Sequence, residues 1–552
     1  MTPDSNAAKA SVTPLREQRE FPGRRIIGHL VGLNGVHGVI ASRFDPEGGE
    51  YWSIGQLITI RHDDARLVGI VCEINSAQGR WLEADSNDAQ VKVELAGAVI
   101  ENEAGEPRFI RGIHTYPKLG AIAHRIRATD LAAIYACDGR ESIELGRLSQ
   151  NGTIPAAVRV DELIRRHFAV IGSTGVGKTS AVAHMIDKLL AVRDRLRVVI
   201  VDPHNEYQAR FQGRCIALDA ETLDLPFWMF SFDEIVDIIH AGRRPTPLEL
   251  DALYEVIKAA RSKFVASQSP ARRLLGQEAT GVFGDAPIPF RVIDAIKIID
   301  EWMGKLEQRY PPIELRALRN RLETLSRDPR LRFMFGKTII EDNMAKIVAN
   351  MFRLPIAGAP VTVLQLGGLP NEVVNAVVAL TARLAFEIAL WSGGDVQIAL
   401  ICEEAHRYIP NDPALGFEPT RRAIGRIAKE GRKYGVSLGI VTQRPSDLDT
   451  TTLSQCATIF AMRLSSETDK AIIRAALADS SGGIVSFASS IADREAIAFG
   501  EAIPTPMRMT FTPVEPAPAD RGRAATLAAR NTSRDVASLI GRLRGEFGGD
   551  PG

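Results

Sequence analysis

The segment GSTGVGKTS, residues 172–180, constrains the fold of this 552-residue chain more than any other stretch. It follows the apolar run HFAVI (167–171) and precedes TSAVAHMIDKLL (179–190), whose apolar spacing indicates a helix. A turn of the form G-x-x-x-x-G-K-[ST] between a strand and a helix cradles phosphate groups with its backbone N–H groups. The sequence therefore predicts a strand–loop–helix unit of a parallel α/β sheet, with an anion site at its turn.

This phosphate-binding loop, the P-loop, supplies the expected nucleotide contacts. Its glycines let backbone N–H groups turn toward phosphate oxygens, Lys178 reaches the β- and γ-phosphates of ATP, and the Thr179 hydroxyl holds Mg²⁺. The residues expected to bind the nucleotide are Gly172, Thr174, Gly175, Val176, Gly177, Lys178, Thr179 and Ser180.

Nearly continuous apolar runs that alternate with helical patterns predict a buried parallel sheet around this loop. The further strands are expected at 197–202, 361–366, 397–404, 437–443 and 457–463. The long gap between the first two is helical in pattern, which predicts an all-α insertion of roughly four or more helices. Ahead of the P-loop, short apolar runs broken by turn residues predict a small β-barrel or sandwich that serves for assembly or docking.

These patterns give the expected domain organisation. A disordered lead-in is expected at 1–22, the barrel at 23–130, the ATPase domain at 131–225 and 356–511, the helical insertion at 226–355, and a linker with an amphipathic helix at 512–552.

Composition narrows the class of partner. Lys plus Arg equal Asp plus Glu at 67 each, so a general basic coat for nucleic acid is excluded while a local basic channel is not. The five cysteines form no CxxC pair, which is typical of reduced thiols in a cytoplasmic protein. The most apolar stretch, 376–391, carries Arg383 and Glu387 and is interpreted as a buried helix, so no membrane association is expected.

Two carboxylates end the strand QIALICEE (397–404), as ATP hydrolysis requires. Glu403 is expected to order the magnesium-bound water, and Glu404 to polarise the attacking water. A third acid, Asp202 in VDPHNEY (201–207), should lie beside the P-loop and assist magnesium or position water, because ligands gather at the carboxyl ends of parallel strands. For His204 and Glu206, an ordinary turn is nearly as good an interpretation.

Gln443 follows the next strand, where a neutral amide senses the γ-phosphate. The helix before that strand carries the basic residues Arg421, Arg422, Arg426, Lys429, Arg432 and Lys433. Most of these belong to a solvated face. One of them is a candidate for an arginine finger that reaches a neighbouring subunit's nucleotide, and others for lining a channel that holds phosphate backbone.

Taken together, the motifs GSTGVGKTS, VDPHNEY, CEEAH, EGRKYGVSLGIVTQRP and REAIAFGEAIPTPMRM resemble those of the HerA-type ATPases of the HerA/FtsK superfamily. The resemblance covers roughly residues 24–511. It implies a RecA-like P-loop ATPase with an N-terminal β-barrel and an inserted helical bundle. Glu403 stands where Asp is usual in Walker B motifs, and Glu is the longer acid.

The resemblance also implies a function. Such proteins form homohexameric rings that hydrolyse ATP with Mg²⁺ at subunit interfaces and move double-stranded DNA through a central channel. They work with a nuclease or a sirtuin-like effector, in DNA end processing or antiphage defence. Motif by motif, Lys178 and Thr179 bind nucleotide and magnesium, Glu404 activates water, Gln443 senses phosphate, and Arg432 is the arginine-finger candidate.

A second hypothesis comes from another class of protein. The ring would then be a nucleotide-gated scaffold that assembles and regulates an effector without processive translocation. A secretion or conjugation ATPase shares the same motor core, but the VDPHNEY and TQRP motifs and the lack of a membrane anchor disfavour it. A small-molecule kinase is disfavoured by the paired acids.

Overall fold

The fold is described from a computed structural model of the chain, which packs as two units, 1–131 and 132–552. The residues described are 25–44, 52–77, 79, 87–137, 139–211, 213–241, 243–268, 285–305, 309–335, 342–355, 358–476, 488–513 and 540. The expected lead-in at 1–22 lies outside them, as does nearly all of the linker and amphipathic helix expected at 512–552.

The first unit is a closed antiparallel β-barrel. Its strands are β1 (Ile26–Asn34), β2 (His37–Phe44), β3 (Leu57–His62), β4 (Ala65–Ser76), β5 (Asn87–Glu101), β6 (Pro107–Arg111) and β7 (Ile122–Arg125). They follow the order β2-β1-β7-β3-β4-β5-β6, and pairing of β2 with β5 closes the barrel while β6 extends beyond it. The sequence patterns were compatible with either a β-barrel or a β-sandwich. The pairing of β2 with β5 closes the sheet and shows that the fold is a barrel.

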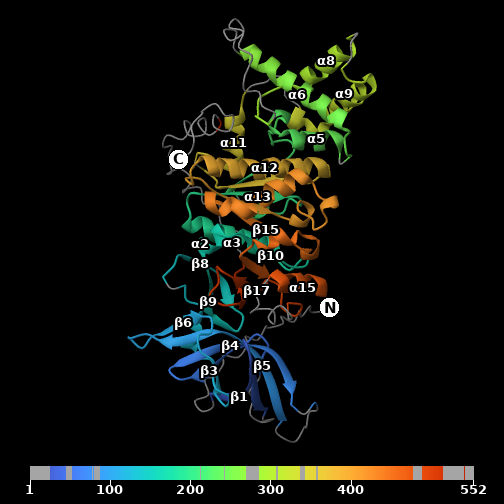
Figure 1. The fold of residues 1–552 in the computed structure, drawn as a ribbon. Helices are drawn as coiled ribbons and strands as arrows, with labels where there is room; N and C mark the ends of the chain where they lie inside the picture. The colour runs from blue at the N-terminus through green and yellow to red at the C-terminus, as the bar shows by residue number, and fades with distance from the viewer. Residues whose placement is uncertain are drawn as a thin grey trace, which may run out of the picture. The chain divides into compact units, whose positions relative to one another are not determined.

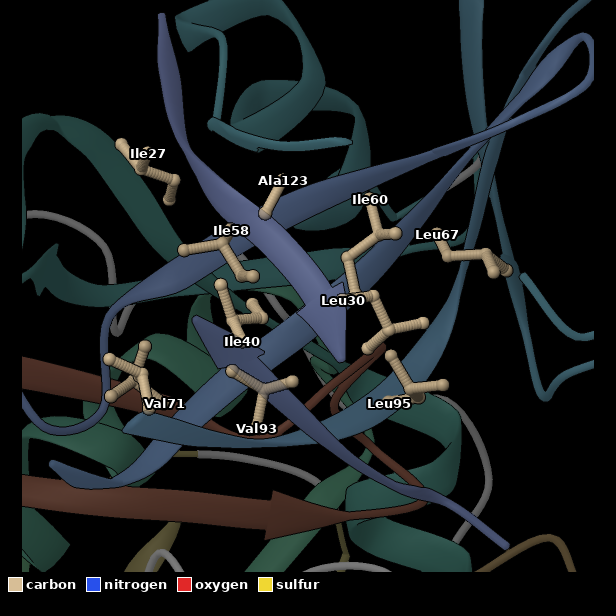
Figure 2. Packing of buried hydrophobic residues seen from close by; sticks show 11 residues of the cluster. Ile27, Leu30, Ile40, Ile58, Ile60, Leu67, Val71, Val93, Leu95 and Ala123 are labelled. Carbon is tan, nitrogen blue, oxygen red and sulfur yellow. The ribbon is translucent and has the colours of Figure 1, made fainter. Parts of the chain in front are cut away.

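The alternation of apolar and polar residues fills the barrel's interior. On β5, Val91, Val93 and Leu95 are buried, whereas Gln90 and Lys92 between and before them are exposed. Side chains from the neighbouring strands point toward the same interior (Figure 2). Full closure of this kind leaves few unpaired strand edges.

The second unit is built on an 11-stranded sheet in the order β12-β13-β11-β14-β15-β10-β16-β17-β18-β8-β9. From β12 to β16 all neighbours pair in parallel. These parallel strands are β10 (Phe168–Ile171), β11 (Leu196–Asp202), β12 (Cys215–Leu218), β13 (Val361–Gln365), β14 (Gln397–Cys402), β15 (Val436–Thr442) and β16 (Thr458–Ala461). The predicted parallel sheet is confirmed, with β12 as a strand that the sequence patterns missed.

The rest of the sheet is antiparallel, which the sequence patterns did not predict. Its strands are β8 (Ser142–Leu148), β9 (Asn151–Arg159), β17 (Glu495–Gly500) and β18 (Met507–Phe511). β17 turns back against β16, and β18 then pairs with β8, some 360 residues earlier in the chain. A pairing over such a separation leaves no local signal in the sequence.

Helices cover the sheet and form the insertion between β12 and β13 (Figure 1). Those that pack on the sheet or beside it are α2 (Val160–Arg165), α3 (Lys178–Val192), α12 (Asn371–Trp391) and α13 (Glu418–Tyr434). The insertion contains α5 (Phe232–His240), α6 (Pro247–Gln268), α8 (Val292–Met303), α9 (Pro312–Arg327), α10 (Arg332–Phe335) and α11 (Met344–Phe352). The predicted helical insertion is therefore confirmed. Short helices elsewhere are α1 (Ala128–Ile134), α4 (Gln208–Phe211), α14 (Thr450–Ser454) and α15 (Glu467–Ala476).

The helix α12 joins the insertion to the sheet. It is long and apolar enough to cross a membrane by length and composition, but 78% of its most apolar window is buried inside the protein. Its Arg383 forms an ion pair with Glu234 on α5 at 3.1 Å, in which Glu234 is buried and Arg383 is half-buried. The pair ties the first helix of the insertion to the helix that covers the sheet.

Candidate functional site

The P-loop lies between β10 and α3, at the carboxyl edge of the parallel strands. Gly175 and Gly177 have φ of 81° and 100°, which is the left-handed region that glycine adopts without a steric penalty. Gly177 caps α3, and no side chain caps the helix there. The free N–H groups of its first turn therefore face the loop, which is the arrangement that binds phosphate.

Lys178 begins this helix and is nearly buried, with 7% of its surface exposed. Its Nζ donates a hydrogen bond to the carbonyl of Ser173 at 3.0 Å, across the loop. Burial lowers the pKa of Lys178, and the nearby carboxylates of Glu403, Glu404 and Glu206 partly offset this effect. The ammonium group therefore lies within electrostatic reach of acids from two different strand ends.

The two glutamates that follow β14 have different surroundings. Glu403 is 5% exposed and accepts a short hydrogen bond from the Tyr207 hydroxyl. Burial raises the pKa of Glu403 to about 7, with the charge of Glu404 adding to the shift, while the Tyr207 bond and Lys178 oppose it. A carboxyl in this state is sensitive to any cation that binds beside it.

Glu404 is the better placed of the two to act on water. Its φ of 52° turns the chain sharply after the strand. One carboxylate oxygen, Oε2, lies 3.3 Å from His406 Nδ1, yet it has no hydrogen-bond partner among the described residues although it is buried. His406 is instead within 3.1 Å of the Thr442 hydroxyl. Burial lowers the pKa of His406, so its imidazole is neutral near pH 7 and leaves Oε2 free to accept a proton from water.

Asp202 was predicted beside the P-loop, but its strand is not a neighbour of the P-loop strand. Two strands, β14 and β15, separate β11 from the P-loop strand β10. Asp202 is fully buried, and its carboxylate accepts hydrogen bonds from the backbone N–H groups of His204 at 3.3 Å and Tyr207 at 2.9 Å. Both carboxylate oxygens of Asp202 are thus engaged within the turn that follows β11. The general rule for carboxyl ends of strands identified the correct edge of the sheet, but it carries no information on strand order.

That turn carries two residues to the site. Glu206 accepts a hydrogen bond from the Thr179 hydroxyl at 2.7 Å, and Tyr207 bonds to Glu403. An ordinary turn had been nearly as good an interpretation for Glu206, because a single acid in a polar turn has no distinctive pattern. Its contact with the P-loop arises from the tertiary fold.

Oxygen ligands of the kind that Mg²⁺ takes are present beside the P-loop. Mg²⁺ is commonly held by one or two carboxylates together with the phosphates of a nucleotide. The Thr179 hydroxyl and the carboxylates of Glu206 and Glu403 provide such groups around Lys178. Among the described residues, no group of three or more His, Cys, Asp or Glu side chains forms a metal site by itself. A cation here would therefore depend on the phosphates as well.

Gln443 follows β15 directly and meets the P-loop. The Thr174 hydroxyl donates a short hydrogen bond to its amide oxygen. This bond orients the amide so that its N–H groups remain available to a phosphate oxygen. The sequence placed both residues near the nucleotide, and the fold brings them into contact.

The P-loop is also hydrogen-bonded to the segment that connects β16 with β17, which the sequence patterns did not assign to the site. The backbone N–H and the hydroxyl of Ser173 both donate to the carbonyl of Arg463, at 2.9 and 3.1 Å. The backbone N–H of Arg494 donates to the carbonyl of Val176 at 3.0 Å. Arg463 follows β16 and Arg494 precedes β17, so the connection between β16 and β17 is hydrogen-bonded to the P-loop at both of its ends.

Arg432 does not join the other predicted site residues within its own chain. It lies near the end of α13, and the residue after that helix, Gly435, accepts a hydrogen bond from Ile398 at the start of β14. Arg432 is therefore at the amino edge of the sheet, opposite Glu404, on a helix of 17 residues. It is exposed and makes no ion pair among the described residues.

Other basic residues of α13 have structural partners. Arg421 pairs with Asp449 at 3.4 Å, and Arg422 with Asp233 at 3.0 Å. Arg426 lies over the ring of Phe386, 4.1 Å from its centroid. The interpretation as a mainly solvated basic face thus needs refinement, because several of these side chains fasten α13 to its neighbours.

Comparisons with known proteins find a family model, curated relatives and solved structures that are similar to this chain. A family model described as the central domain of the HerA helicase matches residues 143–385. The DNA double-strand break repair helicase HerA of Pyrococcus furiosus is 25% identical over 82% of this chain and 86% of its own length. The HerA of Sulfolobus acidocaldarius is 23% identical over 82% and 87%, respectively. Among solved structures, VirB4 of Thermoanaerobacter pseudethanolicus aligns with 69% of this chain and 98% of its own, at 15% identity and a TM-score of 0.48.

The match to the HerA central domain spans β8 to α12, and so includes the P-loop, the turn after β11 and the whole helical insertion. The curated relatives extend the similarity over most of the remaining chain. The chain is therefore similar to HerA helicases over most of its length, and its central part matches the HerA central domain.

Proposed function

We propose that this protein is an ATP-hydrolysing homohexameric ring that translocates on or unwinds double-stranded DNA. It acts with a nuclease or another effector, such as a sirtuin-like protein, in DNA end processing or antiphage defence. The barrel at 23–130 is the docking module for that partner. The five cysteines form no disulfide bond with one another, which supports a cytoplasmic location, where thiols stay reduced.

The observation that carries the proposal is the meeting of separate strand ends around one loop. Lys178 and Thr179 come from the helix after β10, Glu206 from the turn after β11, Glu404 from the end of β14, and Gln443 from the end of β15. Backbone N–H groups and Lys178 would hold the phosphates, and Gln443 would contact the γ-phosphate. The buried Oε2 of Glu404 would take the proton of the attacking water.

Magnesium, held by Thr179 with Glu206 or Glu403, would supply positive charge that offsets the charge developing on the phosphate oxygens. Glu206 is a better choice for this role than Asp202, because both oxygens of Asp202 accept backbone hydrogen bonds within its own turn.

A ring is favoured by the position of Arg432. Its helix ends at the opposite edge of the sheet from Glu404, and 17 residues of α-helix span roughly 25 Å. An arginine at that distance does not serve its own nucleotide, but it is exposed and available to a neighbouring subunit. Arg432 is therefore proposed as the arginine finger, which would make each site complete only between two subunits.

Duplex DNA is proposed as the substrate because relatives that match 82% of this chain are named DNA double-strand break repair helicases. The formal net charge of zero is compatible with that substrate if the basic residues are concentrated in a channel.

The test is ATP turnover measured with and without linear duplex DNA, together with the native mass of the assembly. DNA should stimulate turnover, and Lys178→Ala should abolish nucleotide binding. Glu404→Gln should keep binding and lower kcat by about 10² to 10⁴. A folded hexamer whose ATPase rate ignores every form of DNA would refute translocation, and a protein that stays monomeric with nucleotide would refute the shared site.

The alternative is a nucleotide-gated scaffold that organises an effector without processive movement. The neutral total charge favours it, since a motor on DNA gains from a basic surface. Glu404→Gln separates the two functions, because this variant should still assemble and activate the effector if only binding matters. Effector activity that strictly requires turnover would exclude the scaffold.

A further inference from the structure

A backbone contact fixes Arg494 against the P-loop. Its N–H donates to the carbonyl of Val176, and its own carbonyl accepts a hydrogen bond from the N–H of Phe511 at 2.9 Å. With both backbone groups engaged, its Cα cannot swing away from the loop. The φ of Arg494 is 63°, in the left-handed region that an L-residue with a long side chain seldom adopts.

The side chain of Arg494 lies over the loop. A Cβ atom built on Gly177 would be 3.6 Å from Arg494 Cγ, so the aliphatic stem packs on the face of that glycine. The residue is exposed, and within the described part of the chain its guanidinium group has no hydrogen-bond or ion-pair partner. Arg463, which grips the same loop with its carbonyl, has its guanidinium paired with Asp493 at 2.6 Å.

We propose that Arg494 is a nucleotide-binding residue that acts within its own subunit, with its guanidinium group directed to the part of the nucleotide that ATP and ADP share. The inference rests on the proposed ATP site. It adds a ligand-binding group from the β16–β17 connection to the residues that the P-loop motif supplies. A guanidinium group suits either a phosphate oxygen or the face of a base.

The position on the loop explains why ATP and ADP should be affected alike. The γ-phosphate end of the site is marked by Glu404 and Gln443, and Gln443 bonds to Thr174. Arg494 contacts Val176 and Gly177 instead, in the part of the loop just before the helix. Backbone N–H groups at this position hold the inner phosphates in P-loop proteins. An interaction made equally before and after hydrolysis changes affinity and leaves the chemical step alone.

The test uses the full-length Arg494→Gly variant. Glycine accepts the observed φ and keeps the backbone N–H that donates to Val176, so the substitution removes only the side chain. The dissociation constants of ADP and of a non-hydrolysable ATP analogue should both rise by about tenfold or more, as for loss of a charged hydrogen bond. KM for ATP should rise with kcat nearly unchanged, and Arg494→Lys should recover part of the affinity.

Arg474→Ala is the matched control, because it removes an arginine of the same connection whose charge lies 3.9 Å from Glu467 on its own helix. This variant should bind both nucleotides as the wild type does. If Arg494→Gly binds ADP normally, or loses affinity for the ATP analogue alone, the inference is wrong while the proposed function stands. If the wild-type protein binds neither nucleotide, the proposed function fails and the inference fails with it.

Discussion

His167 makes the stability of the ATPase unit depend on pH in a way that can be worked out from its contacts. The residue directly precedes the P-loop strand and is 2% exposed. The backbone N–H of Leu438 donates to its Nδ1 at 3.0 Å, so Nδ1 carries no proton. Nε2, at 3.1 Å from the carbonyl of Ala428, is then the protonated nitrogen and donates to it. The neutral ring thus links β10, β15 and α13.

Burial lowers the pKa of His167 to about 4, although the carbonyls of Ala428 and Ile427 oppose the shift. In the unfolded chain its pKa is about 6.5. Between these values the unfolded state binds a proton that the folded state does not, so the free energy of unfolding falls as the pH falls from 6.5 toward 4. The full difference corresponds to about 3 kcal/mol, of which about 2 kcal/mol is lost by pH 5.

The measurement is urea unfolding, followed by circular dichroism, of the wild type and of His167→Asn at pH 7.5 and pH 5. Asparagine tolerates the positive φ of 58°, and its amide oxygen can accept from Leu438, but it does not titrate. Between the two pH values the wild type should lose about 2 kcal/mol more than the variant. His240, whose pKa is also lowered to about 4, mainly by burial, is present in both proteins and cancels. Equal losses in the two proteins would refute the reasoning.

Three further predictions concern the site and its support. Glu206→Gln should raise the Mg²⁺ concentration for half-maximal ATPase activity by about tenfold, because Thr179 loses its carboxylate partner. A Mg²⁺ titration of the variant that superimposes on that of the wild type would count against this role of Glu206. Arg383→Leu should destabilise the protein by about 3–5 kcal/mol, because it leaves the buried Glu234 without its cation. In thermal melts, the double variant that also carries Glu234→Leu should recover much of this loss of stability. Arg432→Ala and Lys178→Ala should each be inactive alone but regain part of the ATPase activity when mixed in one ring, whereas no recovery in a verified mixed ring would exclude a finger in trans.

Most of the parallel core could be predicted from sequence because its strands, apart from the half-buried β12, are buried on both faces. β11 and β15 are apolar along nearly their whole length and buried throughout, so the pattern itself indicates the environment. The antiparallel part gave no such indication. β18 alternates buried and less buried residues over only five positions, and its partner β8 lies far earlier in the chain. Its place in the sheet follows from tertiary pairing alone.

The site was predictable to the extent that its chemistry is local. The P-loop motif contains the glycines, Lys178 and Thr179 within one short segment, so these residues could be identified from sequence. The carboxylates after β14 are then brought beside this segment by the fold. The place of the strand that ends at Asp202 could not be predicted, because the order of strands is not encoded near the residue. Glu206 and Arg494 were missed as P-loop contacts for the same reason, since each reaches the loop from a separate strand connection.

The contacts around the P-loop bear on how nucleotide state could reach the subunit surface. Thr174 is hydrogen-bonded to Gln443 at the end of β15, and Leu438 in the same strand is hydrogen-bonded to His167. His167 in turn bonds to Ala428, one helical turn before Arg432 on α13. A nucleotide that shifts the loop at Thr174 must therefore either move β15 and α13 with it or break one of these bonds. Because close-packed elements move as discrete bodies, this chain of contacts connects the γ-phosphate end of one site to the helix that carries the arginine proposed to serve the next. Coupling of this kind requires that His167→Asn, which loses the bond to Ala428, alter the response of turnover to DNA more than it alters the affinity for ATP.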